Sequence, residues 1–248
     1  EVARIKNAFI RMAMEVVKAF DGHVHRVMGD AVMAYFGGKN ARTEAAAIDA
    51  INCAAVLQLL VRVSVVPFLE KEGFGNEFGI RIGVDHGPEE RVLWRSYGFP
   101  GMEEVTATSF YVDVASKLQN AAGRHEVIIG GSLQDLLDLP EELLATKVVV
   151  RNGREEQRPF LLPNLTNDSG NPIDYRQHVL KWDKYLECSP VADGLLTGSS
   201  AVKLQLTATI HASRHGASEG AFVSGGTLGL KNKAICFRIA KLPFVPQL

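Results

Sequence analysis

The sequence has few cysteines and shows no sign of export. Its 248 residues include three cysteines, Cys53, Cys188 and Cys236, which lie far apart and form no CxxC pair. This spacing argues against a zinc site or a disulfide framework and suits a reducing compartment. The first residues open into a helix-like pattern rather than the basic and apolar regions of a signal peptide. We therefore expect a cytoplasmic protein.

The sequence also lacks an excess of charge of one sign and an uninterrupted apolar run. Its formal net charge is −1 and 46% of its residues are hydrophobic, so we expect neither nucleic acid nor a membrane as a partner. The most apolar stretch, residues 45–69, is interrupted by polar side chains and by Pro67, which would break a continuous helix. A buried amphipathic helix is therefore expected there rather than a membrane span. Internal repeats and the phosphate-binding GxxxxGK[ST] and GxGxxG patterns are absent.

Helical and strand-like patterns alternate over residues 1 to about 162. Apolar residues with helical spacing predict helices at 5–20, 43–60, 111–122 and 132–139. Short or alternating apolar runs bounded by turn residues predict strands at 23–28, 31–36, 78–85, 127–129, 147–151 and 160–162. This succession predicts an α/β (α+β) fold in which helices lie against a mixed sheet.

The composition changes after residue 185. Turn-forming residues cluster at 164–174, and strand alternation without helical patterning follows in segments such as 202–210 and 234–239. We therefore divide the chain into a main domain over residues 1–165, a linker over 166–189 and a small all-β domain over 190–248. The C-terminal domain has two interpretations, a sensor for a ligand or a part that completes the fold.

The stretch from His23 to Gly38 has the pattern of two strands joined by a tight corner at Gly29 and Asp30. Glycine removes the steric bar to an unusual backbone angle, so the chain can reverse there and leave the carboxylate at the tip of an apolar hairpin. Asp30 has two interpretations. It is either a turn residue that hydrogen-bonds its own backbone, or a ligand for Mg²⁺ or Mn²⁺ that serves a phosphate substrate.

Three segments carry a family resemblance. GHVHRVMGDAVMAYFGG, RIGVDHGP and TATSFYVDVASKLQNAAGRHEVIIG resemble, in order and spacing, three signature blocks of class III nucleotidyl cyclase catalytic domains. Within that superfamily, the Arg of RVMGD, the VDVASK and VDHGP segments, LWRSYG and the C-terminal β domain look most like the pyrimidine cyclases of bacterial Pycsar antiphage defence. The resemblance covers residues 1 to about 162 and implies a class III cyclase-like mixed sheet flanked by helices.

The resemblance implies a chemistry and a cofactor. Such an enzyme drives the ribose 3′-hydroxyl onto its own α-phosphate and expels pyrophosphate, and two aspartates of the family hold two divalent ions, Mn²⁺ or Mg²⁺, for this step. Asp30 matches the second of these aspartates. The first should lie on a strand upstream of the opening helix, and the sequence contains no such segment. Since the loss of a central strand would expose a sheet edge, we expect that the sequence begins inside the domain.

The resemblance also assigns residues to the nucleobase. The purine-reading Lys of the family corresponds to Arg26, a fixed fork of donors suited to a carbonyl oxygen, and the second base-reading position corresponds to Thr106. This pair is compatible with the polar edge of uracil or cytosine, and we place UTP before CTP. A surface cation on a strand is the alternative for Arg26. His23, His25 and His86 are expected to be surface or turn histidines rather than ligands.

The remaining site residues follow from the same blocks. Asp113 takes the position of the Asn that orients the ribose, and Lys117 takes that of the Arg that stabilises charge at the α-phosphate. The alternative for this pair, four residues apart, is an exposed ion pair on one helix face. Arg151 or Arg154 would replace the triphosphate-binding Lys, or else be a turn cation.

The family arrangement implies a homodimer in which two composite sites form at the interface. Asp30 of one copy would face Arg26, Thr106, Asp113 and Lys117 of the other. The leading hypothesis is therefore a uridylate or cytidylate cyclase whose product, cUMP before cCMP, is a second messenger in antiphage defence. The alternatives are a conventional adenylate cyclase and a non-catalytic module for nucleotide binding or dimerisation.

Overall fold

The structure is a computed structural model that describes residues 2–38, 41–74, 78–166, 168–189 and 233–241. Its α-helices are α1 (Val2–Ala19), α2 (Thr43–Leu60), α3 (Val66–Lys71), α4 (Phe110–Ala121), α5 (Gly131–Leu137) and α6 (Trp182–Cys188). Its strands are β1 (Gly22–Met28), β2 (Ala31–Phe36), β3 (Gly79–His86), β4 (Leu93–Phe99), β5 (Met102–Thr108), β6 (Val127–Gly130), β7 (Leu144–Ala145), β8 (Val148–Arg151), β9 (Arg154–Gln157), β10 (Leu161–Thr166), β11 (Pro172–Asp174), β12 (Gln177–Leu180) and β13 (Lys233–Lys241).

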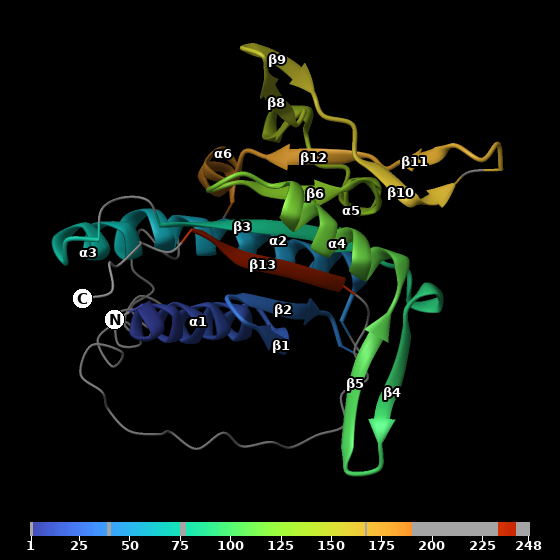
Figure 1. Cartoon of the computed structure of the whole chain (residues 1–248), viewed down its shortest axis with the longest axis horizontal. Coiled ribbons are helices and arrows are strands. Elements are labelled where there is room, and N and C mark those ends of the chain that lie inside the picture. The colour runs from blue at the N-terminus through green and yellow to red at the C-terminus, as the bar shows by residue number, and fades with distance from the viewer. Residues whose placement is uncertain (1, 39–40, 75–77, 167, 190–232, 242–248) are drawn as a thin grey trace.

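A seven-stranded sheet in the order β1-β2-β13-β3-β6-β12-β7 organises these elements. The β3–β6 pair is parallel and the pairs on either side of it are antiparallel, so the sheet is mixed. Side chains of α1 and α2 pack with residues of β2, β3 and β6 in one apolar core, while α4 packs on the opposite face with Tyr35 and Ile128 (Figure 1). The predicted fold class, a mixed sheet flanked by helices, is confirmed.

The apolar stretch predicted to be a buried helix is buried in its middle part, but its form differs from the prediction. All residues from 50 to 58 are buried, including the polar Asn52 and Gln58, so this part of α2 is buried on all sides rather than amphipathic. Pro67 does not end the helical path, because a π-helical turn over Val61–Val65 leads into α3 with the proline in its first turn, where no amide donor is required. By length and composition residues 43–71 could cross a membrane, but half of their most apolar window lies inside the fold, as in a core helix.

Strand β13 lies between β2 and β3 and is antiparallel to both. It fills the gap that these two strands would otherwise leave, so neither has an unpaired edge there. The rest of the predicted C-terminal domain, 190–232 and 242–248, lies outside the described residues, and that domain stays a prediction. The segment expected as a linker, 166–189, differs from expectation, because it contains β11, α6 and also β12, which is paired between β6 and β7.

The hairpin formed by β4 and β5 protrudes from the body of the molecule as an arm (Figure 1). Its apolar side chains are largely exposed, with Phe99 79% and Met102 82% accessible at the tip and Leu93, Tyr97 and Val105 about half accessible. The sequence analysis does not predict this arm. Exposed apolar side chains grouped on one projecting element are typical of a surface that another protein chain covers.

Candidate active site

The predicted corner between the first two strands is present. β1 and β2 form an antiparallel hairpin that closes with the pair Met28 and Ala31. Gly29 adopts φ +63°, a conformation that costs a side-chain-bearing residue free energy, although nothing lies within 4 Å of a Cβ built at this position. The glycine is therefore required by the backbone angle rather than by space, and it leaves Asp30 half-buried at the corner.

A β-bulge interrupts β1 at His25. Val24 pairs with Ala34 and Arg26 pairs with Met33, so His25 is an extra residue with no partner of its own on β2. In a regular strand neighbouring side chains point to opposite faces. A bulge re-aims them, and here both His25 and Arg26 reach the arm.

The two contacts with the arm are made by residues on one face of β5. The Arg26 guanidinium forms an ion pair with Glu104, and His25 Nε2 lies 3.2 Å from Thr106 Oγ1 in a hydrogen bond. Glu104 and Thr106 are two residues apart on a strand and therefore share a face. The structure thus gathers Arg26 and Thr106, the two residues predicted to read the base, into one cluster with His25 and Glu104.

Aromatic packing fixes the base of the arm against the sheet. The rings of His25 and Tyr35 are 5.2 Å apart between centroids, those of His25 and Trp94 are 5.8 Å apart, and those of Tyr35 and Trp94 are 4.8 Å apart, all edge to face. Such pairs are favoured by the ring quadrupoles. Burial, and next the charge of Arg26, lower the pKa of His25. The sequence analysis expects His25 to be a surface or turn histidine, whereas the structure shows it half-buried against two aromatic rings.

The predicted ribose and α-phosphate residues lie on α4. Ser109 caps this helix, its Oγ accepting from the backbone N–H of Tyr111 at 3.2 Å. Asp113 is exposed and Lys117 is half-buried. The described part of the chain contains no ion pair between these two side chains, so both remain able to meet a substrate. The helix begins at Phe110, four residues after Thr106 and two after the end of β5, which ties its position to that of the base-reading cluster.

The predicted triphosphate residues lie far from that cluster within one chain. Arg151 pairs with Arg154 across the predicted turn at Asn152 and Gly153. In Figure 1 the β8–β9 hairpin projects beyond β12, at the end of the molecule opposite to β1 and the arm. The structure therefore does not bring Arg151 to Arg26 in a single copy.

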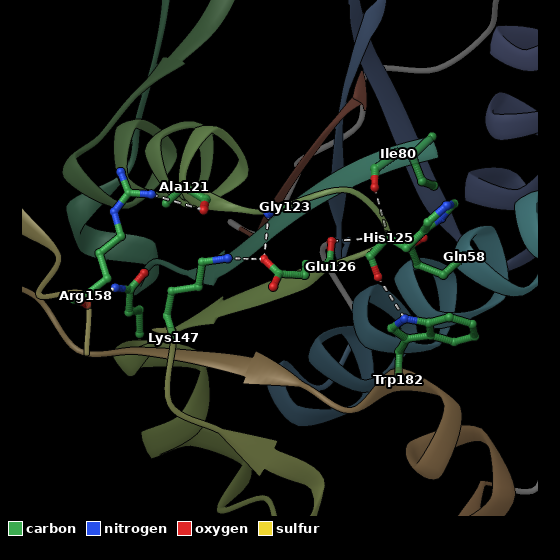
Figure 2. Close-up of polar contacts among 10 residues, drawn as sticks. Gln58, Ile80, Ala121, Gly123, His125, Glu126, Lys147, Arg158 and Trp182 are labelled. Atoms are coloured by element: carbon green, nitrogen blue, oxygen red, sulfur yellow. Dashed lines mark hydrogen bonds and ion pairs between the residues drawn. The ribbon is translucent and has the colours of Figure 1, made fainter. Parts of the chain in front are cut away.

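A lysine close to Arg151 in the sequence, Lys147, has a structural role rather than a free charge for a phosphate. Lys147, which precedes β8, is 6% exposed and forms an ion pair with Glu126 (Figure 2). The Glu126 carboxylate also accepts from the amide of Gly123, and its backbone carbonyl accepts from Gln58 Nε2 at 3.1 Å. Since this network joins the turn after α4 to α2 and β8, Lys147 holds the fold together, whereas Arg154 is exposed.

The described residues supply only part of a metal site. Among residues 2–38, 41–74, 78–166, 168–189 and 233–241, no three His, Cys, Asp or Glu side chains are grouped to hold an ion. Asp30 provides one carboxylate at the half-buried corner. Mg²⁺ commonly takes one or two protein carboxylates and completes its shell with phosphate oxygens and water, so Asp30 fits such an ion only when a triphosphate contributes.

A buried carboxylate at the end of β3 is a feature that the sequence analysis does not single out. Asp85 is 1% exposed, and it accepts from Tyr175 Oη at 2.8 Å and from the amide of His86 at 2.9 Å. Burial raises the pKa of Asp85 to about 7, even though the hydrogen bonds from His86, Tyr175 and Leu133 act to lower it. His86 is half-buried, with its Nδ1 3.4 Å from Ser132 Oγ, and His23 is exposed.

This shift predicts a pH dependence of stability. A carboxyl whose pKa is higher in the folded than in the unfolded chain stabilises the fold below pH 3.8, and this stabilisation is lost as the pH rises to about 7. Asp85→Asn removes the effect. The quantity to compare is the unfolding free energy of the variant minus that of the wild type, measured by urea denaturation at each pH. This difference should rise by roughly 2–4 kcal/mol from pH 4 to pH 8, because only the wild type loses the stabilisation. Asp168→Asn, at an exposed turn, is the control, and an equal gain there would contradict the assignment.

Comparison with known proteins gives relatives of one kind. The chain is 39% identical over 186 residues to a cytidylate cyclase of Staphylococcus aureus, covering 75% of this chain and 43% of the relative. It is 38% identical over 191 residues to a cytidylate cyclase of Escherichia coli, covering 77% and 42%. The chain thus spans less than half the length of these curated relatives. No protein-family model matches it.

Solved structures show the same fold. The adenylyl cyclase CyaB from P. aeruginosa superposes with a TM-score of 0.57 at 16% identity, covering 71% of this chain and 80% of that chain. The guanylyl cyclase Cya2 gives a TM-score of 0.50 at 16% identity, covering 62% and 76%. The resemblance to class III nucleotidyl cyclase catalytic domains, and within them to pyrimidine cyclases, is confirmed.

Proposed function

We propose that the protein is a metal-dependent class III nucleotidyl cyclase that converts a pyrimidine nucleoside triphosphate to its 3′,5′-cyclic monophosphate and pyrophosphate. The similarity to cytidylate cyclases over three quarters of the chain carries this proposal. The sequence analysis favours UTP over CTP, whereas the names of the relatives favour CTP. We therefore take CTP as the first substrate and UTP as the second.

The chain's own residues divide the reaction between them. Arg26 and Thr106 bind the base, and Asp113 faces the ribose. The ribose 3′-hydroxyl loses its proton to solvent, and the bond from its oxygen to the α-phosphorus forms as the bond from that phosphorus to the bridging oxygen of pyrophosphate breaks. Lys117 offers a positive charge to the oxygens of the α-phosphate, on which negative charge concentrates. Asp30 would hold a divalent ion, which would supply positive charge to lower the pKa of the hydroxyl or to neutralise the leaving pyrophosphate.

A homodimer explains why one chain holds the parts in separate places. Asp30 lies at the tip of the β1–β2 hairpin, the base-reading cluster joins β1 to the arm, and the β8–β9 hairpin projects at the other end of the molecule (Figure 1). The exposed apolar arm offers a surface for a second copy. Two copies placed head to tail would bring Asp30 and Arg151 toward residues of the opposite chain. The cytoplasm supplies the nucleotide, and a role of the product as a signal in antiphage defence rests on the resemblance to the Pycsar cyclases.

The reaction is tested by incubating the native protein that carries this chain with CTP, UTP, ATP and GTP separately, each with Mn²⁺ or Mg²⁺. We expect cyclic CMP as the main product and cyclic UMP at a lower rate, identified by chromatography against standards. Predominant cyclic AMP or cyclic GMP would contradict the pyrimidine assignment and support a conventional purine cyclase. The absence of any cyclic product would support the non-catalytic module instead.

A further inference from the structure

We infer that Glu104 is a specificity-determining residue that selects cytosine over uracil, with Arg26 as its fixed partner. The inference rests on the proposed function, because it concerns the base of the same substrate. No sequence block singles out Glu104, and it enters the site only through the ion pair that Arg26 makes with the arm.

The ion pair leaves polar groups available to a ligand. The Arg26 side chain is 33% exposed and that of Glu104 is 57% exposed, so a base can reach both. The ion pair engages the Nη2 of Arg26, and a guanidinium has further N–H donors. The Nε of Arg26 is buried and has no hydrogen-bond partner among the described residues, so the donors left for a base are the remaining N–H groups of the guanidinium.

The carboxylate of Glu104 is a hydrogen-bond acceptor and the guanidinium of Arg26 is a donor. This order of acceptor and donor complements the edge of cytosine and conflicts with the edge of uracil. Cytosine presents a donor at N4, an acceptor at N3 and an acceptor at O2. A carboxylate accepts from N4, as acidic side chains do when they read cytosine, while an adjacent guanidinium donates to N3 and O2.

Uracil presents the opposite pattern at two of these positions. Its O4 would face the Glu104 carboxylate, which sets acceptor against acceptor, and its N3–H would face an Arg26 N–H, which sets donor against donor. Polar groups left unpaired or opposed in a binding site strongly disfavour the wrong ligand. The pair therefore discriminates by repulsion of uracil as well as by attraction of cytosine.

The surroundings keep the pair in position. The bulge at His25 turns Arg26 toward the arm, and the rings of His25, Tyr35 and Trp94 pack edge to face at the base of the arm. The hydrogen bond between His25 and Thr106 fixes the same face of β5 that carries Glu104. A preorganised carboxylate discriminates better than a mobile one, because it cannot move away from uracil O4.

A purely structural role for the ion pair makes a different prediction. An exposed ion pair contributes little to stability. If the ion pair only held the arm in place, its removal would change kcat/KM for CTP and for UTP by the same factor. Glu103, the next residue on β5, is a matched control, because it is also an exposed glutamate and its carboxylate accepts from Ser96 Oγ at 3.1 Å on the opposite face of the arm.

The test compares wild type, Glu104→Gln, Glu104→Ala and Glu103→Gln in the native protein. The first readout is the ratio of kcat/KM for CTP to that for UTP, and the second is the thermal stabilisation by each nucleotide. We expect Glu104→Gln and Glu104→Ala to lower the CTP preference about tenfold, since one charge-assisted hydrogen bond to the base is lost. Glu103→Gln should leave the ratio within about twofold of the wild type.

Three outcomes would overturn the inference. They are a wild type that prefers UTP, a Glu104→Gln ratio equal to that of Glu103→Gln, and an equal loss for both nucleotides. An active wild type with an unchanged ratio in the variants refutes this inference and leaves the cyclase intact. If the wild type makes no cyclic nucleotide, the proposed function fails, and equal thermal stabilisation by CTP and UTP then overturns the base assignment as well.

Discussion

Asp30→Asn should reduce cyclic nucleotide formation by about 10²- to 10³-fold in the native protein while leaving the fold intact. The carboxylate at the corner is the described side chain that matches a metal-binding aspartate of the family. An ion at a phosphoryl centre supplies several kcal/mol of charge stabilisation, and each 1.4 kcal/mol is about a tenfold change in rate. An amide keeps the shape of the side chain and removes its charge.

The structure separates this chemical effect from a folding effect. Gly29 provides the positive φ that the corner requires, so the reversal of the chain does not depend on residue 30. Asparagine also favours turns, since its side chain can hydrogen-bond the local backbone as aspartate does. The midpoint of thermal unfolding should therefore shift by no more than about 2 °C, roughly 0.5 kcal/mol for a chain of this length.

A second turn aspartate provides the control for Asp30. Asp21 is exposed, follows α1, has φ +53° and precedes β1 at the opposite end of the strand. Asp21→Asn makes the same chemical change, and asparagine tolerates this backbone angle. Activity should be retained there. If Asp30→Asn keeps more than about a tenth of the wild-type rate, or if Asp21→Asn loses as much, the assignment of Asp30 to the metal is wrong.

The elements that the sequence predicts well are those set by neighbouring residues. The hairpin at Gly29 and Asp30 and the helix from residue 111 follow from a glycine corner, strand alternation and an apolar stripe, all of which act within a few positions. The turn at Asn152 and Gly153 is correct for the same reason. These features carry Asp30, Asp113 and Lys117, so the sequence locates those side chains even though their roles stay predictions.

The features that the sequence misses depend on contacts between distant segments. Arg26 and Glu104 lie far apart in the chain, and they meet because a bulge at His25 re-aims β1 and the arm folds back beside it. The bulge has no local signature, since the residues around it also fit a regular strand. The arm has a turn signal in Pro100 and Gly101, but the local pattern does not reveal that its strands leave the main sheet and meet β1. Asp85 is missed because strand alternation does not reveal that Tyr175, 90 positions later, covers its carboxylate.

The second large expected effect is the loss of stability and activity on substitution of Gly83, where α4 approaches β3 closely. A Cβ built on Gly83 would lie 2.3 Å from the carbonyl oxygen of Ala115 and 2.3 Å from the amide nitrogen of Gln119. Both are backbone atoms of α4 and cannot rotate away as a side chain can. The helix therefore rests directly on the strand at this glycine, and any side chain there must displace it.

Gly83→Ala should lower the unfolding free energy by about 2–3 kcal/mol, the upper part of the usual range for an overpacked core, and the unfolding midpoint by roughly 5–10 °C. Since α4 carries Asp113 and Lys117, a displacement of about 1 Å should also reduce the cyclase rate by about 10²-fold at temperatures where the variant is folded. Gly38→Ala is the control, because nothing lies within 4 Å of a Cβ built there. The unfolding midpoint is measured by calorimetry and the cyclase rate by product formation. Equal values for Gly83→Ala and Gly38→Ala would show that α4 does not pack directly against β3 at Gly83.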